Sequence, residues 1–477
     1  MTTIEIPQRR LETGYDNTAE DCISREPLVT GEATYHAVTK IVCATPEARR
    51  APKIWYVCFT ISLMLLCVLF LTIAYQVFTG VGVWGNNSPD AWGFDIINFV
   101  FWVGIAHAGT MISAILLMFR QRWRTGINRF AEATTVFSVL CAGIYPAIHV
   151  GRPWFAYWLL PYPNIMGDWP NFYSPLLWDA LAVGTYSTFS FLFWYFGMVP
   201  DLATLRDRAK TRLRYTLYGV FALGWRGSAR HWKIYDRGMI IMGGLACALV
   251  LAVSSTVSTD FAVSQIPGWH ETIFPPYFTV GAIFSGFATV IALAIPARHL
   301  FGLKDLITER HMDNLGKLML VLSSIVLYIY LIEFFTAYYS GNIYERFAYY
   351  NREFGPYWWM GWAMMFCNGV IPQALWFKKA RTTWWLSLPI ALLALFGMWT
   401  ERFSIIVTSI HRDFLPSSWH MYSPTIIDIG MFAGSFGLFF TLFLLFCRFL
   451  PMVAMSEVKS ILPQSHTHLP EECRNAE

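Results

Sequence analysis

The chain has 477 residues, of which 55% are hydrophobic, 17% aromatic and only 14% charged. Its apolar residues form long blocks separated by short polar segments, a pattern that excludes an ordinary water-soluble protein and indicates an integral membrane protein. The formal net charge of +4 excludes little by itself, because in a membrane protein the placement of Lys and Arg matters more than their sum.

A membrane-spanning helix needs about 20 apolar residues, and the sequence has ten such blocks. The predicted spans are residues 54 to 79, 94 to 119, 130 to 150, 176 to 198, 238 to 259, 277 to 297, 315 to 340, 357 to 376, 384 to 407 and 425 to 449. A transmembrane β-barrel would show alternating segments of about ten residues instead. We therefore predict an all-α membrane domain over residues 54–450, between polar tails at residues 1–53 and 451–477.

The basic residues indicate which side of the membrane each loop occupies. Loops after even-numbered spans hold most of the Lys and Arg, whereas loops after odd-numbered spans hold only Arg152, Arg346, Arg352 and Arg412. Positively charged loops stay in the cytoplasm. Both termini are therefore predicted to be cytoplasmic, and the loops after spans 3 and 5 to lie on the outer face.

The nine cysteines show no CxxC or CxxCH spacing, so we expect no zinc, iron–sulfur or c-haem site in this chain. A di-haem four-helix protein needs histidines paired across two helices at both membrane depths, whereas this chain offers His107 at the centre of span 2 and His149 at the rim of span 3. We therefore expect no bound cofactor, and any electrons must pass to a partner at the outer face.

Polar residues gather where spans 2 to 5 meet the outer face. Span 2 begins near Asp95, which we interpret as structural because it lies at the interface. Span 3 ends at His149, span 4 carries Asp179 in its first turns, and span 5 ends at Asp260. A structural role for Asp179 stays open, since the helix dipole favours an acid near a helix N-terminus.

His149, Asp179 and Asp260 thus share one membrane depth and form the predicted site. Oxidation of a hydroquinone releases two protons and two electrons, and a histidine with carboxylates is suited to accept the protons. The candidate pocket around them contains Tyr145, Arg152, Trp154 and Trp178, and Phe155 and Phe261 are further candidates to wall the ring.

Spans 6–9 resemble a second version of spans 2–5. This predicts two four-helix bundles related by an axis along the membrane normal, with spans 1 and 10 peripheral. An ionisable side chain inside a span costs at least about 2.5 kcal/mol, which makes it a functional candidate. The candidates for a proton path are His107, Glu333, Glu401, Arg402 and Asp428.

Structural roles compete for each of these residues. His107 could be a neutral histidine bonded to a carbonyl group. Glu401 and Arg402 could form a structural network with Glu333 or Asp428. Because adjacent residues lie about 100° apart on a helix, we expect Glu401 and Arg402 to face different neighbours.

Five stretches carry a resemblance to a known family: REPLVTGEATYHAVT, FDIINFVFWVGIAHAGTMISAIL, CAGIYPAIHVGRPW, PNFYSPLLWD and ERFSIIVTSI. They resemble the NrfD or polysulfide-reductase membrane-subunit family, and more closely the C subunits of alternative complex III, a bacterial quinol oxidoreductase. The resemblance implies a cofactor-free, ten-helix subunit of the bacterial inner membrane, with a periplasmic quinol site whose histidine and two aspartates match His149, Asp179 and Asp260.

The same resemblance implies partners and an activity. The expected partners are c-type cytochrome subunits, a periplasmic iron–sulfur subunit and a second NrfD-like membrane subunit. The expected activity is oxidation of quinol or menaquinol within the complex, coupled to proton translocation.

Other functions stay open beside this one. The chain could be the sister F subunit of the same complex, which has the same fold without the quinol site, or a quinone-linked anchor of a molybdopterin enzyme that reduces polysulfide. A secondary transporter belongs to a different class, although transporters typically have inverted repeats, whereas the repeat predicted here is parallel.

Overall fold

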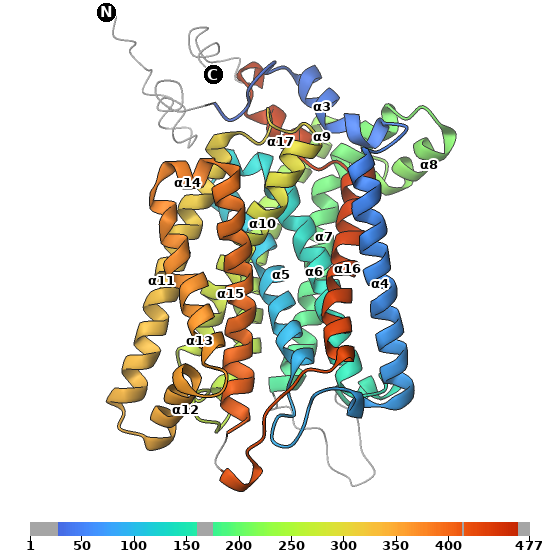
Figure 1. Ribbon diagram of the computed structural model, residues 1–477. Coiled ribbons are helices and arrows are strands. Elements are labelled where there is room, and N and C mark those ends of the chain that lie inside the picture. Colours follow the sequence, from blue (N-terminus) through green and yellow to red (C-terminus); the bar gives the residue numbers. More distant parts are fainter. Residues whose placement is uncertain (1–26, 160–174, 413–414, 466–477) are drawn as a thin grey trace, which may run out of the picture.

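The computed structural model describes residues 27–159, 175–412 and 415–465, and every regular element they form is a helix. The long helices are α4 (Lys53–Thr79), α5 (Phe94–Met118), α6 (Asn128–His149), α7 (Pro175–Asp207), α9 (Ala229–Ala262), α10 (Phe274–Leu300), α11 (Glu309–Tyr339), α15 (Trp384–Ile410) and α16 (Ile426–Phe449). They run roughly side by side (Figure 1).

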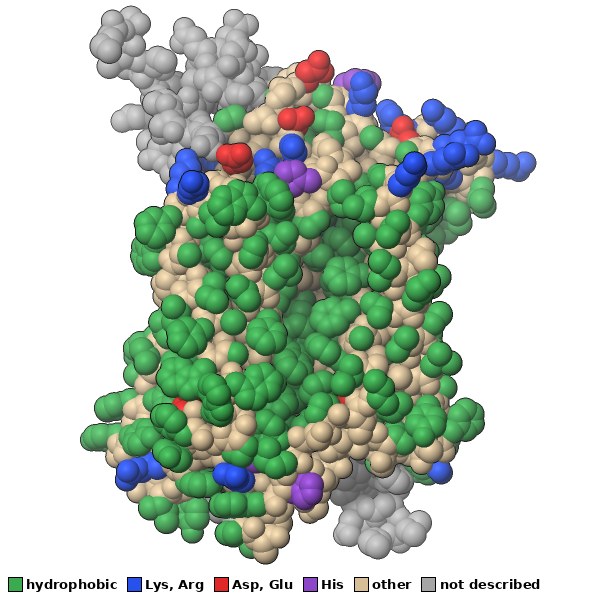
Figure 2. Space-filling model, viewed as in Figure 1, with side chains coloured by type: hydrophobic (Ala, Val, Ile, Leu, Met, Phe, Trp, Pro, Cys, Tyr) green, Lys and Arg blue, Asp and Glu red, His purple; other side chains and the backbone are tan. Residues whose placement is uncertain are grey.

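The remaining α-helices are shorter, and most of them lie at the two ends of the long ones. These are α3 (Tyr35–Glu47), α8 (Arg212–Phe221), α12 (Ile343–Phe354), α13 (Trp358–Met364), α14 (Lys378–Thr382) and α17 (Met455–Ser460). Helices α3, α8, α14 and α17 lie at one end and α12 lies at the other (Figure 1). Figure 2 shows a broad hydrophobic band between the two ends, and most of the visible Lys and Arg side chains lie at the first end. We call it the basic end, and the opposite end the outer end.

Eight helices in the described residues are long and apolar enough to cross a membrane, and they coincide with predicted spans 1, 2, 3, 5, 6, 7, 9 and 10. The chain is therefore a multi-pass integral membrane protein. Predicted span 4 corresponds to α7, which is 33 residues long but is not among the eight. Tyr, Ser, Thr and Gly residues lower the mean hydropathy of its central stretch, VGTYSTFSFLFWYFG.

Predicted span 8 is not one regular helix. The α-helical segment α13 passes into a π-helical segment over Met365–Val370 and then a 3-10 segment over Ile371–Trp376. Pro372 lies in the first turn of the last segment. A π segment carries an additional residue within a turn and often occurs at functional sites. Here it contains Asn368, which contacts the buried Glu401 described below.

Helix α5 lies at the centre of the molecule and α4 lies at its edge. The apolar part of α5 is 88% buried, whereas that of α4 is 11% buried. Helix α5 packs against α6, α9 and α10, and α4 packs chiefly against α16. Span 1 is thus peripheral, as the sequence predicts.

Glycines allow α16 to approach α4 closely. A Cβ atom at Gly434 would lie 2.6 Å from Leu69 Cβ, and one at Gly437 would lie 2.5 Å from the backbone nitrogen of Leu66. Small residues at such spacing let two helix backbones touch in lipid, where packing rather than water exclusion favours association. The first and last spans therefore form one tightly packed pair.

A buried charged cluster joins α6 to α7 near the basic end. Arg129 Nη2 lies 3.1 Å from Asp201 Oδ2 and donates to the Gly197 carbonyl at 2.9 Å. Arg129 Nη1 lies 3.4 Å from Glu132 Oε2, and Glu132 also accepts a hydrogen bond from Ser113 at 2.7 Å. The Arg129, Glu132 and Asp201 side chains are 1–2% exposed, so their charges are stabilised almost entirely by one another and by these hydrogen bonds.

Candidate functional site

His149 is paired with Asp95 at the outer end of α6 and α5. Asp95 lies in the first turn of α5, where its Oδ1 accepts from the Gly93 amide at 3.1 Å. Its Oδ2 forms a short contact with His149 Nδ1. The Asp95 side chain is 2% exposed and that of His149 is 32% exposed. The carboxylate therefore orients a ring that remains partly exposed. This relationship was not expected from the sequence, where we interpreted Asp95 as structural.

The end of α6 is fixed by a residue from α4. The buried Gln76 donates from Nε2 to the carbonyl oxygens of Ile148 at 3.0 Å and Gly151 at 2.7 Å. Gly151 has φ = 88°, a conformation that glycine adopts without the strain of a side chain. These bonds satisfy carbonyl groups that the end of α6 leaves free, and they hold the backbone beside His149 in place.

Asp179 and Asp260 face each other from α7 and α9, and their carboxyl groups are within hydrogen-bond reach. Asp179 is 6% exposed and Asp260 is half-buried. The Oδ1 atom of each is buried without a hydrogen-bond partner in the described residues. Two ionised carboxylates within hydrogen-bond reach would repel each other, whereas one proton shared between them would allow a hydrogen bond.

The structure therefore groups the predicted triad as two pairs. Asp179 lies with Asp260, whereas His149 pairs with Asp95. Helices α5, α6, α7 and α9, which supply the four side chains, pack as neighbours. Residues 160–174 of the outer loop, including Trp169, lie outside the described residues.

The candidate pocket residues take different positions. Tyr145 is buried one turn inside His149, near Asn98 and Ser435. Arg152 lies over the exposed Trp154 ring at 5.8 Å, and Trp178 is 39% exposed. Of the two further aromatic candidates, Phe155 is half-buried and Phe261 packs in a buried aromatic cluster with Trp92 and Trp269.

His107 is a buried residue of α5 and lies beside α7 and α9. Its Nδ1 atom is 3.0 Å from the Ser254 hydroxyl of α9, and its ring packs edge-on against Tyr186 with centroids 4.9 Å apart. The described partner is thus a hydroxyl group and not the carbonyl expected for a structural histidine.

Glu401 and Arg402 of α15 contact each other, but their other neighbours differ, as expected. Glu401 meets Tyr330 and Asn368, whereas Arg402 lies over the Phe278 ring at 4.2 Å. Arg402 Nη1 and Glu401 Oε1 are 3.0 Å apart, although without hydrogen-bond geometry. Tyr330 donates to Glu401 in a short hydrogen bond, and Asn368 donates to the same oxygen at 3.3 Å. Long side chains that bend along the helix can meet despite diverging from adjacent positions.

A second set of ionisable groups leads from this network to the outer end. The buried Glu333 interacts electrostatically with Arg352, Glu271, Glu401 and Arg402. In the outer loop, Glu271 accepts from Tyr349 at 2.9 Å. Burial raises the pKa of Glu271, against the lowering effects of that hydrogen bond and of Arg352. Sequence reasoning did not include Glu271, Tyr349 or the buried Arg352 in a site, because Glu271 lies in the loop before α10 and the other two lie on α12, outside the long apolar runs.

Asp428 has a structural position. Its Oδ2 accepts from the amides of Thr425 at 2.8 Å and Gly85 at 2.9 Å, and it completes a capping box at the start of α16. Such a cap satisfies free amides at a helix N-terminus. Asp428 therefore lies apart from the Glu401 and Arg402 network proposed as its alternative partner.

The ionisable side chains described above interact mainly through ion pairs and through contacts with hydroxyl groups. Among the residues that the structure describes, no group of three or more His, Cys, Asp or Glu side chains is placed to hold a metal ion. What the outer arrangement can do chemically is accept protons and hydrogen bonds through an oriented imidazole and two carboxyl groups.

A family model described as "Polysulphide reductase, NrfD" matches residues 82–412, a region that contains His149, Asp179, Asp260 and both networks. The chain belongs to the NrfD family. The match covers more than half of the chain and confirms the predicted resemblance to the NrfD family, whereas the closer resemblance to the C subunits of alternative complex III stays a prediction.

Two curated proteins are similar to this NrfD chain. One is a putative membrane subunit (C) of a dimethyl sulfoxide reductase from Halobacterium salinarum, 26% identical over 227 residues, which are 47% of each protein. The other is the C subunit of selenate reductase from Mesobacillus selenatarsenatis, 20% identical over 413 residues, which cover 83% of this chain and 93% of the relative. The match thus spans about half of the first relative and nearly all of the second.

Proposed function

We propose that this NrfD chain is the membrane subunit of a multi-subunit oxidoreductase and exchanges electrons with quinol at its outer end. The observation that carries the proposal is the pair of facing carboxyl groups of Asp179 and Asp260, at the same outer end as the oriented His149. Placing an ionisable group within a membrane span costs free energy, so such groups are expected to serve a substrate or a proton pathway.

The chemistry of the site balances for quinol oxidation. A quinol gives up two protons and two electrons as it becomes a quinone. His149 donates through Nδ1 to Asp95, which leaves Nε2 as an acceptor for one proton. The carboxyl pair accepts the other at an unpartnered oxygen. The two electrons leave for a redox group of a partner subunit docked at the outer end.

We favour a reductase complex in which the chain is the quinol-linked membrane anchor, because both named relatives are subunits of reductases. A catalytic reductase subunit and an electron-transfer subunit are then the expected partners. The second candidate is the C subunit of alternative complex III, with iron–sulfur and c-type cytochrome partners. It is favoured by the joint presence of His149, Asp179 and Asp260 and by the motif REPLVTGEATYHAVT.

The proposed arrangement in the membrane follows the same reasoning. We propose ten crossings, with α7 and the α13–η4–η5 segment added to the eight apolar helices, and both termini in the cytoplasm of a bacterial cell. The contacts of α5, α6, α7 and α9, and those of α10, α11, α13 and α15, support two four-helix bundles. The basic end would then face the cytoplasm.

The test is purification of the chain with its natural partners in a mild detergent, followed by assay of quinol-dependent reduction of the co-purifying cofactors. A molybdopterin group would assign the chain to a reductase complex, and c-type haem would assign it to alternative complex III. A chain that elutes alone, or a complex whose cofactors are not reduced by any quinol, would contradict the proposal and favour a transporter.

We further propose that the buried network of Glu401, Tyr330 and Glu333 carries protons. Replacing Glu401 with Gln should abolish proton translocation by the reconstituted complex while leaving quinol oxidation largely unchanged, because the network is separate from His149 and Asp179. A pH-sensitive dye inside proteoliposomes measures this. Glu309→Gln, an exposed glutamate at the basic end of α11, is the matched control. Normal proton movement in Glu401→Gln would exclude this path.

A further inference from the structure

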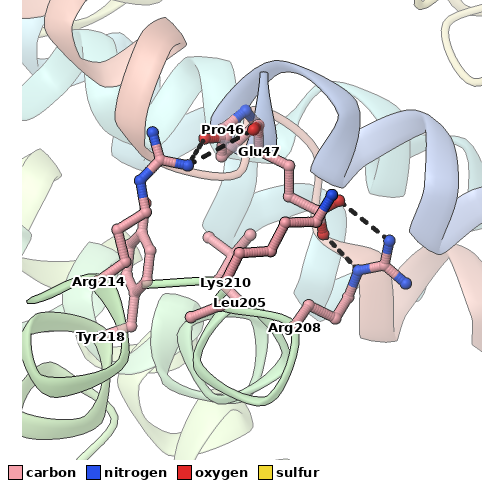
Figure 3. Close-up of a pocket in the computed structure, with 8 residues that line it drawn as sticks. Pro46, Glu47, Leu205, Arg208, Lys210, Arg214 and Tyr218 are labelled. Atoms are coloured by element: carbon pink, nitrogen blue, oxygen red, sulfur yellow. Dashed lines mark hydrogen bonds and ion pairs between the residues drawn. The ribbon is translucent and has the colours of Figure 1, made fainter. Parts of the chain in front are cut away.

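A small hollow at the basic end has an excess of positive charge. It is open to solvent and lies between the end of α3, the end of α7 and the start of α8. Arg208, Lys210 and Arg214 line it together with a single acid, Glu47 (Figure 3). Three cationic side chains thus surround one carboxylate, far from the outer site.

Two of the cations are held in place by α3. Arg208 binds both carboxylate oxygens of Glu47 through a short contact at Nε and a 3.1 Å bond from Nη2. Arg214 donates from Nη1 to the carbonyl of Pro46 at 3.1 Å and to that of Glu47 at 3.5 Å (Figure 3). Tyr218, one turn further along α8, is fixed by its hydrogen bond to the Phe449 carbonyl at 2.9 Å.

Lys210 differs from the two arginines. Among the described residues no hydrogen bond or ion pair engages its ammonium group, and Figure 3 draws none. Its charge is therefore not neutralised by a fixed partner, while Glu47 is already occupied by Arg208. The hollow is suited to an anion that would accept from Lys210 and from the remaining donors of Arg214.

The outer surface of α8 shows what lies next to this hollow. Leu213, Leu217 and Phe221 are four residues apart and form a stripe that is 70%, 48% and 53% exposed. No residue of α8 is buried within the described chain, and the helix projects sideways from the basic end (Figure 1). A helix with an exposed apolar stripe and basic residues lies in the membrane interface with its apolar side chains in lipid.

The stripe therefore places the hollow at the depth of the lipid headgroups. Arg214 and Tyr218 point from the adjoining face of α8 into the hollow (Figure 3). Anionic lipids are enriched in the cytoplasmic leaflet, where basic pockets between helices bind their headgroups. A soluble anion would gain the charge contacts but nothing from the apolar stripe.

We propose that Lys210 and Arg214, with the Tyr218 ring lining the site, bind the phosphate group of an anionic phospholipid in the cytoplasmic leaflet. Glu47 holds the Arg208 guanidinium in position, Lys210 supplies the unneutralised charge, and the stripe of α8 contacts the acyl chains. Such a lipid would join α3, which belongs to the N-terminal segment, to the α7–α8 connection.

The test measures lipid retention by the intact complex. The complex is stripped of lipid in detergent, phosphatidylglycerol or phosphatidylcholine is added back, and bound lipid is counted by native mass spectrometry. Lys210→Gln should weaken phosphatidylglycerol binding about fivefold, the effect of one surface cation on an anionic lipid, and Lys210→Arg should restore it. Lys304→Gln, an exposed lysine at the same end, should bind as wild type does.

Competition identifies the source of the phosphate. Excess inorganic phosphate or glycerol phosphate should displace little phosphatidylglycerol, because neither reaches the apolar stripe. Full displacement by either would show a soluble-anion site and overturn the proposal, as would equal retention of phosphatidylcholine or unchanged binding by Lys210→Gln. Lys210 has no partner in the described chain, so its replacement tests binding without breaking the contacts that hold α3.

Discussion

Replacing Asp179 with Asn should lower quinol-dependent turnover of the assembled complex by about 100-fold to 10,000-fold, the usual effect of removing a group that transfers a proton. The amide keeps the size of the side chain and can still hydrogen-bond to Asp260, but it cannot take up a proton. Steady-state quinol oxidation, with assembly checked by size-exclusion chromatography, measures the loss.

Asp207→Asn is the matched control for that experiment. Asp207 ends the same helix, and its side chain is 64% exposed beside Arg206, so this variant should turn over as wild type does. Asp95→Asn should cause a smaller loss, about 10-fold to 100-fold, since Asp95 acts by orienting His149. Normal turnover in Asp179→Asn would remove the carboxyl pair from the mechanism.

Replacing Arg129 with Met should destabilise the folded chain by about 3–5 kcal/mol, because it leaves two buried carboxylates without their cation. Glu132 and Asp201 would lose the guanidinium that lies 3.1–3.4 Å from them. The expected result is a large fall in thermal stability in detergent, followed by fluorescence-detected size-exclusion chromatography.

Two further variants separate charge from packing at that position. Arg226→Met removes an exposed arginine at the same end and should leave stability unchanged. The triple variant Arg129→Met, Glu132→Gln and Asp201→Asn removes all three charges and should recover much of the loss, since replacing a whole buried charge group is often nearly neutral. A triple variant as unstable as Arg129→Met would mean that lost packing, not unpaired charge, dominates.

Depth in the membrane could be predicted from the sequence, but rotation about the helix axis could not. Alternating spans place His149, Asp179 and Asp260 at one end, and the two aspartates do face each other. The apolar pattern of a span buried on all sides does not show which face a polar residue occupies. That His149 meets Asp95 depends on such a rotation.

Element ends and irregular segments escaped prediction for a related reason. Hydropathy placed the end of span 4 at residue 198, yet α7 continues to Asp207, because the buried Arg129 compensates the charge of Asp201. The π segment of Met365–Val370 could not be predicted, because the apolar run of span 8 does not distinguish a π segment from a regular α-helix. It brings Asn368 to Glu401, which a regular helix through span 8 would not have suggested.

The glycine-mediated contact of α4 with α16 has a consequence for biosynthesis. The ribosome makes α4 first among the long helices and α16 last, so α4 must wait in the bilayer until every other span has been inserted. Its apolar surface, without a single charge from Ile54 to Phe78, suits a helix that stays largely exposed to lipid until its main partner is made. Docking of α16 against Leu66 and Leu69 would then close the molecule at the end of translation, and a chain truncated before α16 should leave α4 open to capture by quality-control proteases.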